Sequence, residues 1–257
     1  MLSLISARGA GLQLDPYDLK NESLELSLYV GEHYSGNIWR DFARWVIQEN
    51  LKTPSQVLDL GCENGVLTCF LASLWPTAHI VGVDRSGPAI RAAKALAEKL
   101  ELKNVSFEQR DGKDFLLEHQ GRFSIITATM VMHEYLERLN SREPFKWNEV
   151  YECLEDVCLS EIDDHVIAVL KIVETSLADG GYLITLNRSP SSATSWWYTQ
   201  CLEAAGMKVS LSRGSVIETS EASGAEKFPL IVARKVQEGD EKTTPEGLAN
   251  CTARDRI

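Results

Sequence analysis

The segment 56–74 constrains the fold most, because a short apolar run is followed by two glycines and then by a helical pattern. Residues 56–60 are mostly apolar and of β-type, so they predict a buried strand. Gly61 and Gly65 follow at once, and residues 66–74 carry apolar side chains at helical spacing. In such a strand–turn–helix unit, glycines let the backbone approach a ligand, and the helix N-terminus offers unpaired N–H groups to it. The segment therefore predicts a nucleotide-type pocket.

The glycine loop does not have the pattern of a dinucleotide site. It reads Asp59-Leu-Gly-Cys-Glu-Asn-Gly65 and lacks the third glycine by which a G-x-G-x-x-G loop approaches a pyrophosphate. It resembles motif I of the class I S-adenosylmethionine (SAM) dependent methyltransferases, commonly acid-x-Gly-x-Gly-x-Gly, with Glu63 in place of the middle glycine. A tight turn that binds no ligand is the alternative interpretation.

This resemblance implies that the loop contacts the methionine part of SAM, whose ammonium and sulfonium groups are cationic and suit the charge of Asp59. Glu63 narrows the room for the ligand, so cofactor affinity is the property it affects. The loop residues that the resemblance assigns to cofactor binding are Asp59, Gly61, Cys62, Glu63, Asn64 and Gly65.

An acid stands at the end of the next predicted strand. Residues 79–83 form an apolar run that ends in Asp84, and a helix is predicted over 86–100. A carboxylate at this place can accept hydrogen bonds from both hydroxyl groups of a ribose. The resemblance implies the same role for Asp84 toward SAM and places Arg85 beside it in the cofactor site. A strand-end acid without a ligand is the alternative.

Further cofactor contacts are expected after the third and fourth strands, predicted at 105–109 and 123–128. The resemblance implies that Asp111 meets the adenine amino group and that the N–H of Gly112 meets the ring. Asp114 is the alternative acid, or the N-cap of the following helix. Because the ends of parallel strands face the ligand crevice, Thr127 should line the cofactor site.

The complete pattern predicts an α/β fold. A long helical stretch spans 145–177, and further strands are expected at 182–186, 206–211 and 228–234. The connection over 212–227 is too short for a helical crossover, so the last pair should be antiparallel. The resemblance implies a three-layer Rossmann-like fold with a seven-stranded sheet, mostly parallel with an antiparallel last strand.

Three regions are predicted along the chain. Residues 1–55 form an N-terminal extension with a turn at 15–18 and an amphipathic helix at 32–50 that packs on the core. Residues 56–235 form the SAM-binding domain, with a helical insertion at about 133–179, and residues 236–257 form a disordered tail.

Composition excludes several classes of protein. No apolar stretch approaches the roughly 18 residues of a membrane span, so no membrane partner is expected. The six cysteines are scattered without a Cys-x-x-Cys pair, which argues against a metal site and against disulfides and favours a cytoplasmic location.

Charge favours some partners over others. The net charge of −11 predicts that the protein has no nucleic-acid partner, because neutralising phosphates needs a basic surface. The segment 133–179 holds 12 acidic and 4 basic residues. A solvated helix face explains it better than a docking site for a basic substrate.

Methyl transfer to a small-molecule acceptor is the predicted activity. The alternatives are a protein methyltransferase and a catalytically silent protein that binds partners with a SAM-type fold. His133, just beyond the fourth strand, is the candidate catalytic base, although a structural histidine at a helix start is the alternative.

Overall fold

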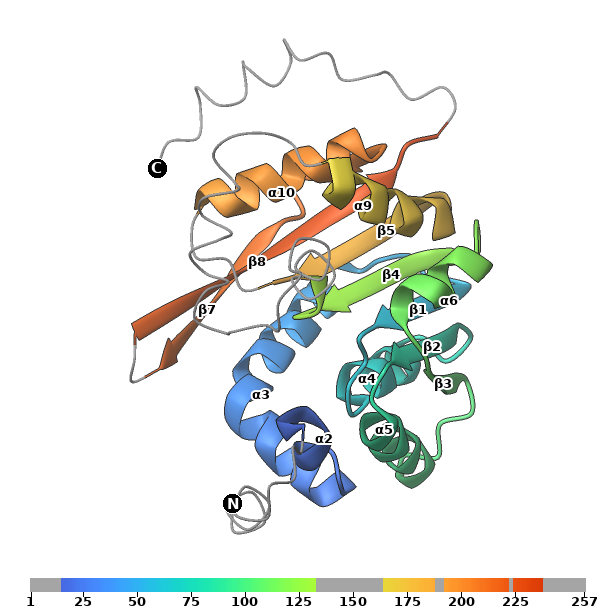
Figure 1. Ribbon diagram of the computed structural model, residues 1–257, viewed down its shortest axis with the longest axis vertical. Helices are drawn as coiled ribbons and strands as arrows, with labels where there is room; N and C mark the ends of the chain where they lie inside the picture. The colour runs from blue at the N-terminus through green and yellow to red at the C-terminus, as the bar shows by residue number, and fades with distance from the viewer. Residues whose placement is uncertain (1–14, 133–163, 188–191, 222–223, 238–257) are drawn as a thin grey trace.

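The computed structural model describes residues 15–132, 164–187, 192–221 and 224–237, and it is built around one eight-stranded sheet (Figure 1). The strands are β1 (Gln56–Leu60), β2 (His79–Asp84), β3 (Val105–Gln109), β4 (Phe123–Thr129), β5 (Leu177–Leu186), β6 (Met207–Val209), β7 (Ser215–Glu221) and β8 (Gly224–Lys235). The helices are α2 (Pro16–Lys20), α3 (Leu24–Glu49), α4 (Val66–Leu74), α5 (Gly87–Lys99), α6 (Gly112–Glu118), α9 (Asp164–Ser176) and α10 (Ser192–Ala204).

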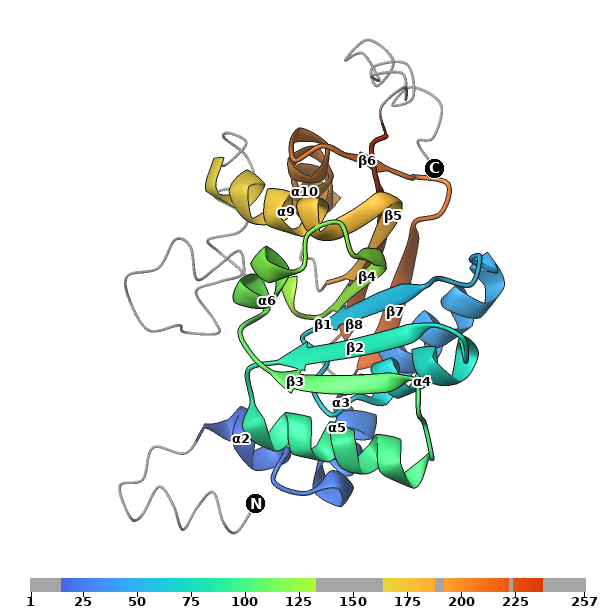
Figure 2. The same cartoon turned by 90° about the vertical axis from the view of Figure 1, so that its right-hand side faces the viewer.

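Helices cover both faces of the sheet, as Figure 2 shows. The strand order is β3-β2-β1-β4-β5-β8-β6; the first five of these strands are parallel, and β8 runs antiparallel to β5. On one face, α6, α9 and α10 pack against side chains such as Leu58 and Ile126. On the other, α3 and α4 pack against Val57 and Ile80, and α5 lies beside α4 over Phe107. The predicted three-layer Rossmann-like fold is confirmed.

The C-terminal part of the chain adds one strand more to the sheet than predicted. Ser215–Glu221 lies within the predicted connection 212–227, but it pairs with β8 over its whole length as β7. β6 and β7 lie one after the other along β8, because Met207 pairs with Lys235 and Glu221 with Gly224. The last strands are antiparallel, as predicted. The polar sequence of β7 gave no apolar run to indicate a strand.

The N-terminal prediction of a turn at 15–18 is wrong, because these residues begin the helix α2. Asp15 is its N-cap, with a side chain that accepts a hydrogen bond from the N–H of Tyr17 at 2.8 Å, and Pro16 occupies the first helical position. An Asp-Pro pair suits a helix start as well as a turn. The amphipathic helix also starts earlier than predicted, because Ser23 caps α3.

Other boundaries differ by a few residues, and some predictions lie outside the described part. β5 begins at Leu177 rather than at 182, with a register shift against β4 between Phe123 and Ile125. The predicted insertion is described only from residue 164 onward, and the predicted tail only to residue 237. None of the helices in the described ranges has the length and hydropathy to cross a membrane.

Candidate cofactor-binding site

The glycine loop after β1 is shaped by three left-handed residues. Gly61, Glu63 and Gly65 have φ angles of 71°, 47° and 76°. A Cβ atom on Gly61 would lie 2.5 Å from a methyl group of Val131, and one on Gly65 would lie 2.7 Å from the Cβ of Ala93. The two glycines are therefore required both for the backbone turn and for close packing.

Asp59 is held rigidly at the start of this loop. It is buried, and its two carboxylate oxygens accept hydrogen bonds from the Oγ1 atoms of Thr68, at 2.6 Å, and Thr127, at 2.8 Å. Burial raises the pKa of Asp59 to about 6, although the two hydroxyl groups oppose this shift. The structure thus brings together Asp59 and Thr127, which are both predicted site residues, and adds Thr68, which was not predicted. Thr68 is a polar residue within an apolar helical pattern, which was the available signal.

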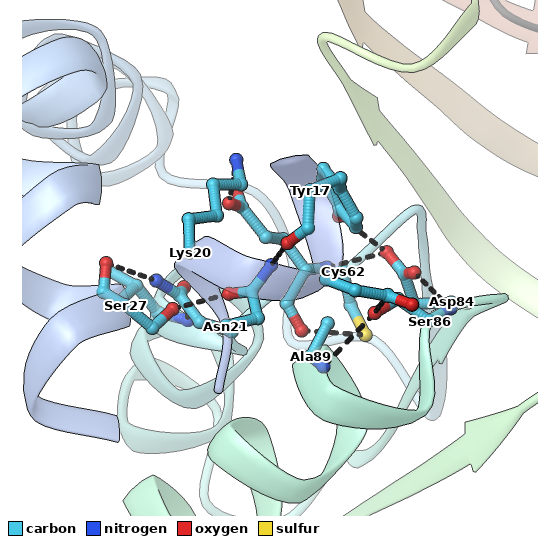
Figure 3. A network of polar contacts seen from close by, with 12 residues as sticks. Tyr17, Lys20, Asn21, Ser27, Cys62, Asp84, Ser86 and Ala89 are labelled. Atoms are coloured by element: carbon cyan, nitrogen blue, oxygen red, sulfur yellow. Dashed lines mark hydrogen bonds and ion pairs between the residues drawn. The ribbon is translucent and has the colours of Figure 1, made fainter. Parts of the chain in front are cut away.

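Asp84 joins three segments at the end of β2 (Figure 3). One carboxylate oxygen accepts a hydrogen bond from the N–H of Ser86 at 2.9 Å. The other accepts from the N–H of Glu63 at 3.0 Å and from the hydroxyl group of Tyr17 at 3.1 Å. Asp84 is only 7% exposed, so its charge is directed at these donors and at the glycine loop.

The side chain of Glu63 forms an ion pair with Lys20 of α2. Its position in the motif is that of a glycine, and its left-handed backbone is the conformation that a glycine adopts without strain. The Glu63 side chain is therefore engaged with the N-terminal helix, which the sequence pattern did not predict.

Cys62 and Asn64 have buried side chains with structural contacts. The pKa of the Cys62 thiol is raised well above its usual value, because burial and the nearby Asp59 and Asp84 carboxylates disfavour the thiolate. Asn64 accepts a hydrogen bond from the N–H of Val66 at 3.3 Å and donates one to the carbonyl oxygen of Ser27 at 3.3 Å. Asn64 therefore fixes the loop to both α4 and α3.

Asp111 and Gly112, which are predicted to contact adenine, follow the end of β3. The N–H of Arg110 donates to the carbonyl oxygen of Asp84 at 2.9 Å, which brings the loop after β3 next to β2. Asp111, rather than Asp114, is the N-cap of α6, and Gly112 is the first residue of that helix and is buried.

Of the two remaining predicted residues, Arg85 and His133, only Arg85 is described by the structure. Arg85 lies between Asp84 and the N-cap of α5, and its carbonyl oxygen accepts a hydrogen bond from the side chain of Gln109 at 3.3 Å. His133 lies outside the described residues. In the part of the chain that the structure describes, no three His, Cys, Asp or Glu side chains are grouped so that they could hold a metal ion.

Besides Thr68, the sequence prediction missed the residues of α2. Tyr17, Asp18 and Lys20 contact Asp84, Ser86 and Glu63, respectively. The sequence separation between Tyr17 and Asp84 is 67 residues. The Asp15-Pro helix start was a usable signal for α2, but no local pattern could indicate where this helix packs.

A family model described as "Methyltransferase domain" matches residues 51–205. The chain belongs to this methyltransferase family. The match includes the glycine loop, Asp84, Asp111 and Thr127, so the predicted membership of the SAM-dependent methyltransferase class is confirmed.

Curated relatives of this methyltransferase resemble it over parts of their length. A ubiquinone biosynthesis O-methyltransferase of Albidiferax ferrireducens is 26% identical over 139 residues, which are 53% of this chain and 43% of that protein. A tRNA (guanine-N(7)-)-methyltransferase of Chloroflexus aggregans is 29% identical over 133 residues, 52% of this chain and 51% of that protein. The chain spans about half or less of the length of the curated relatives it matches.

Solved structures share the fold. Magnesium protoporphyrin IX methyltransferase from Synechocystis, solved with bound SAM, has a TM-score of 0.53 and 17% identity, covering 83% of this chain and 84% of that one. A SAM-dependent methyltransferase from Methanosarcina mazei has a TM-score of 0.52 and 16% identity, covering 74% and 97%. At these identities the likeness concerns the fold alone.

The relatives overturn the prediction that nucleic acid is excluded as a partner. Besides the tRNA methyltransferase, they include the ribosomal RNA small subunit methyltransferase C of Salmonella choleraesuis, 33% identical over 85 residues, 33% of this chain and 24% of that protein. The exclusion rested on the net charge of the whole chain. The segment 133–179 holds 12 acidic and 4 basic residues, so it accounts for most of the net charge of −11. The net charge of the whole chain therefore says little about the charge of the remaining residues.

Proposed function

We propose that the carboxyl ends of β1 and β2 bind SAM and that the protein transfers the methyl group of SAM to an acceptor. The observation that carries this proposal is the placement of Asp84, buried at the end of β2 and directed at a glycine loop in left-handed conformation. The hydroxyl group of Tyr17 already donates a hydrogen bond to Asp84, so this carboxylate is positioned to accept a hydroxyl donor such as a ribose.

The residues present fit the chemical groups of the cofactor. Asp84 would accept the ribose hydroxyl groups, and Gly112 and Asp111 would meet the adenine. The pKa of Asp59 is about 6, so this buried carboxylate is ionised at neutral pH and suits the cationic methionine part near the loop. The left-handed backbone at Gly61 and Gly65 gives the loop the tight turn that a cofactor loop needs.

When bound, SAM supplies an electrophilic methyl group on a sulfonium ion. The protein's own task is then to hold the acceptor atom in line with that methyl group and to exclude water. A base is needed only where the acceptor must lose a proton, and His133 is the proposed base in that case. Its replacement by alanine would then lower turnover by roughly 10²–10⁴-fold at unchanged SAM affinity.

We propose a small molecule as the acceptor. The support is the ubiquinone biosynthesis O-methyltransferase, whose 139-residue match is longer than those to the RNA-modifying relatives named above. RNA is the second candidate, because the names of several relatives specify ribosomal or transfer RNA. A protein acceptor and a catalytically silent binding protein are further alternatives.

Calorimetric titration with SAM and with S-adenosylhomocysteine tests cofactor binding. Asp84→Ala should weaken both by tenfold or more, because each lost hydrogen bond to a charged group costs about 1.5–3 kcal/mol. Glu98→Ala, which removes an exposed acid on α5, is the control and should bind like the wild type. Equal affinity of folded Asp84→Ala and wild type would reject the ribose assignment.

A screen for S-adenosylhomocysteine release identifies the acceptor class. Small metabolites, total RNA and a peptide mixture should be supplied separately to the wild type and to Asp84→Ala. Release with metabolites alone supports the first proposal, and release with RNA alone supports the second. Binding of SAM without release in any arm would favour a silent binding protein.

A further inference from the structure

The hydrogen-bonding capacity of Asp84 is largely in use. Among the described residues it accepts three hydrogen bonds, from the N–H groups of Ser86 and Glu63 and from the Tyr17 hydroxyl. An ionised carboxylate offers about four lone-pair positions. A ribose bound through both hydroxyl groups would bring the number of donors to five, so one present donor must leave.

Tyr17 is the donor that can leave at low cost. The N–H groups of Glu63 and Ser86 belong to the loops that form the site, and their bonds to Asp84 fix those loops. Tyr17 instead belongs to α2, a five-residue helix, and helices this short have little stability of their own. Its hydroxyl group also stands where a ribose hydroxyl would have to donate.

We propose that α2 is a latch on the cofactor site: Tyr17 competes with the ribose of SAM for Asp84, and cofactor binding detaches the helix. This inference rests on the proposed function, since it takes Asp84 as the ribose acceptor. It assigns Tyr17 the role of a residue that sets cofactor affinity by occupying the site.

The other contacts of α2 suit a reversible attachment (Figure 3). Lys20 pairs with Glu63, and both side chains are partly exposed, so the pair contributes little net stability. Asp18 accepts a hydrogen bond from the hydroxyl group of Ser86 at 2.6 Å. These two contacts and that of Tyr17 end on the two loops that the cofactor would contact, so a ligand there would disturb them together. The buried C-cap Asn21 accepts a hydrogen bond from the hydroxyl group of Ser27 at 2.5 Å, which ties the C-terminal end of α2 to α3.

The phenol of Tyr17 stays protonated over the ordinary pH range. Its pKa is raised well above the usual value because burial and the carboxylates of Glu63 and Asp84 disfavour the phenolate. The phenol therefore remains a hydrogen-bond donor. Its ammonium neighbour Lys20 lies 4.5 Å from the centre of the Tyr17 ring and holds the side chain in place.

Tyr17→Phe removes the competing hydroxyl group and keeps the ring. We expect S-adenosylhomocysteine to bind about three- to tenfold more tightly to this variant, measured by calorimetry, because a typical net hydrogen bond no longer has to be broken. The matched control is Tyr29→Phe on α3, whose side chain is 76% exposed and which should bind like the wild type. If the wild type binds S-adenosylhomocysteine and Tyr17→Phe binds it equally or more weakly, the latch is rejected. The proposed function is then unaffected.

Hydrogen exchange distinguishes detachment of α2 on ligand binding from closure of α2 over the ligand. If α2 detaches, the amides of residues 18–21 should exchange faster when S-adenosylhomocysteine is bound. Slower exchange would mean that α2 closes over the ligand, which contradicts the proposal. If neither the wild type nor Tyr17→Phe binds the ligand, the proposed function itself fails, and the latch fails with it.

Discussion

At the scale of single residues, Glu63 shows what a motif can and cannot predict. The sequence identified it as the departure from the motif, at the place of a glycine. The structure explains why the motif has a glycine at this position. The φ angle of Glu63 is 47°, which residues with a side chain disfavour. The side chain pairs with Lys20, so its contact lies on α2.

Glu63→Gly is expected to change stability little. Removing a left-handed side chain relieves about 1–2 kcal/mol of strain, and losing a partly exposed ion pair costs about 0–1 kcal/mol. Chemical denaturation should therefore give an unfolding free energy equal to or slightly above that of the wild type. Cofactor affinity should be unchanged or higher. Lys20→Ala, which removes the ion pair and also the contact of Lys20 with the Tyr17 ring, is the comparison. Markedly weaker binding by Glu63→Gly only would show that Glu63 contacts the ligand.

Asp59 gives a prediction about pH. Its pKa is about 6 in the folded state against 3.8 ordinarily, so the folded protein binds more protons between these values. Stability contributed by Asp59 is therefore fully present below about pH 4 and is lost as pH rises to about 6, by up to roughly 3 kcal/mol. Asp59→Asn should lack this pH-dependent part of the unfolding free energy. The measurement is the unfolding free energy of both proteins, without ligand, at pH 4.5 and at pH 7. A stability difference between the two proteins that is the same at both pH values would contradict the raised pKa.

At the scale of elements, sequence patterns predicted the helices and strands whose buried residues form a regular pattern along the chain. β1 and α4 lie at the predicted residues, because each presents a continuous buried run or face to the core. α2 and β7 were missed for a shared reason. Neither has a long apolar run in its sequence. α2 also contacts Asp84, which is distant in the chain, whereas β7 pairs with the neighbouring β8 as a hairpin.

The same distinction applies to the candidate site. Asp59, Asp84 and the glycine loop follow strands that could be predicted, so their meeting at one edge of the sheet follows from parallel topology. Tyr17 could not be placed there, because its approach is set by how α2 packs. Asp111 was assigned to adenine from the motif, and its capping of α6 required the backbone geometry.

Helix α3 is joined to the far end of the chain through Trp45. The indole N–H donates to the carbonyl oxygen of Arg213 at 3.1 Å, and the ring is 8% exposed. Trp45→Phe should lower the unfolding free energy by about 1–3 kcal/mol, from the lost hydrogen bond and the smaller buried ring. Trp196→Phe, at a site 47% exposed, is the control and should be within about 0.5 kcal/mol of the wild type. An equal effect of the two changes would show that the α3 contact contributes nothing specific.

At the scale of the whole molecule, the sheet has exposed edges that must not pair with other chains. β3 forms one edge and has only Phe107 buried, with the exposed Glu108 beside it. A charge on an edge strand opposes pairing between molecules. Glu108→Val should therefore raise light scattering on heating near the unfolding temperature. Glu98→Val, the same change on the exposed face of α5, is the control, and equal scattering by both variants would assign the effect to hydrophobicity alone.

The Trp45 contact also has a consequence for synthesis on the ribosome. Trp45 and its partner Arg213 are 168 residues apart, and α3 packs in the same cluster as Ile217 and Phe228. At about 5–20 residues per second, the nascent helix waits roughly 10–30 s before this part of its apolar face can be covered. α3 is translated before these docking partners. The nascent α3 is thus a part of the chain on which a ribosome-associated chaperone has time to act.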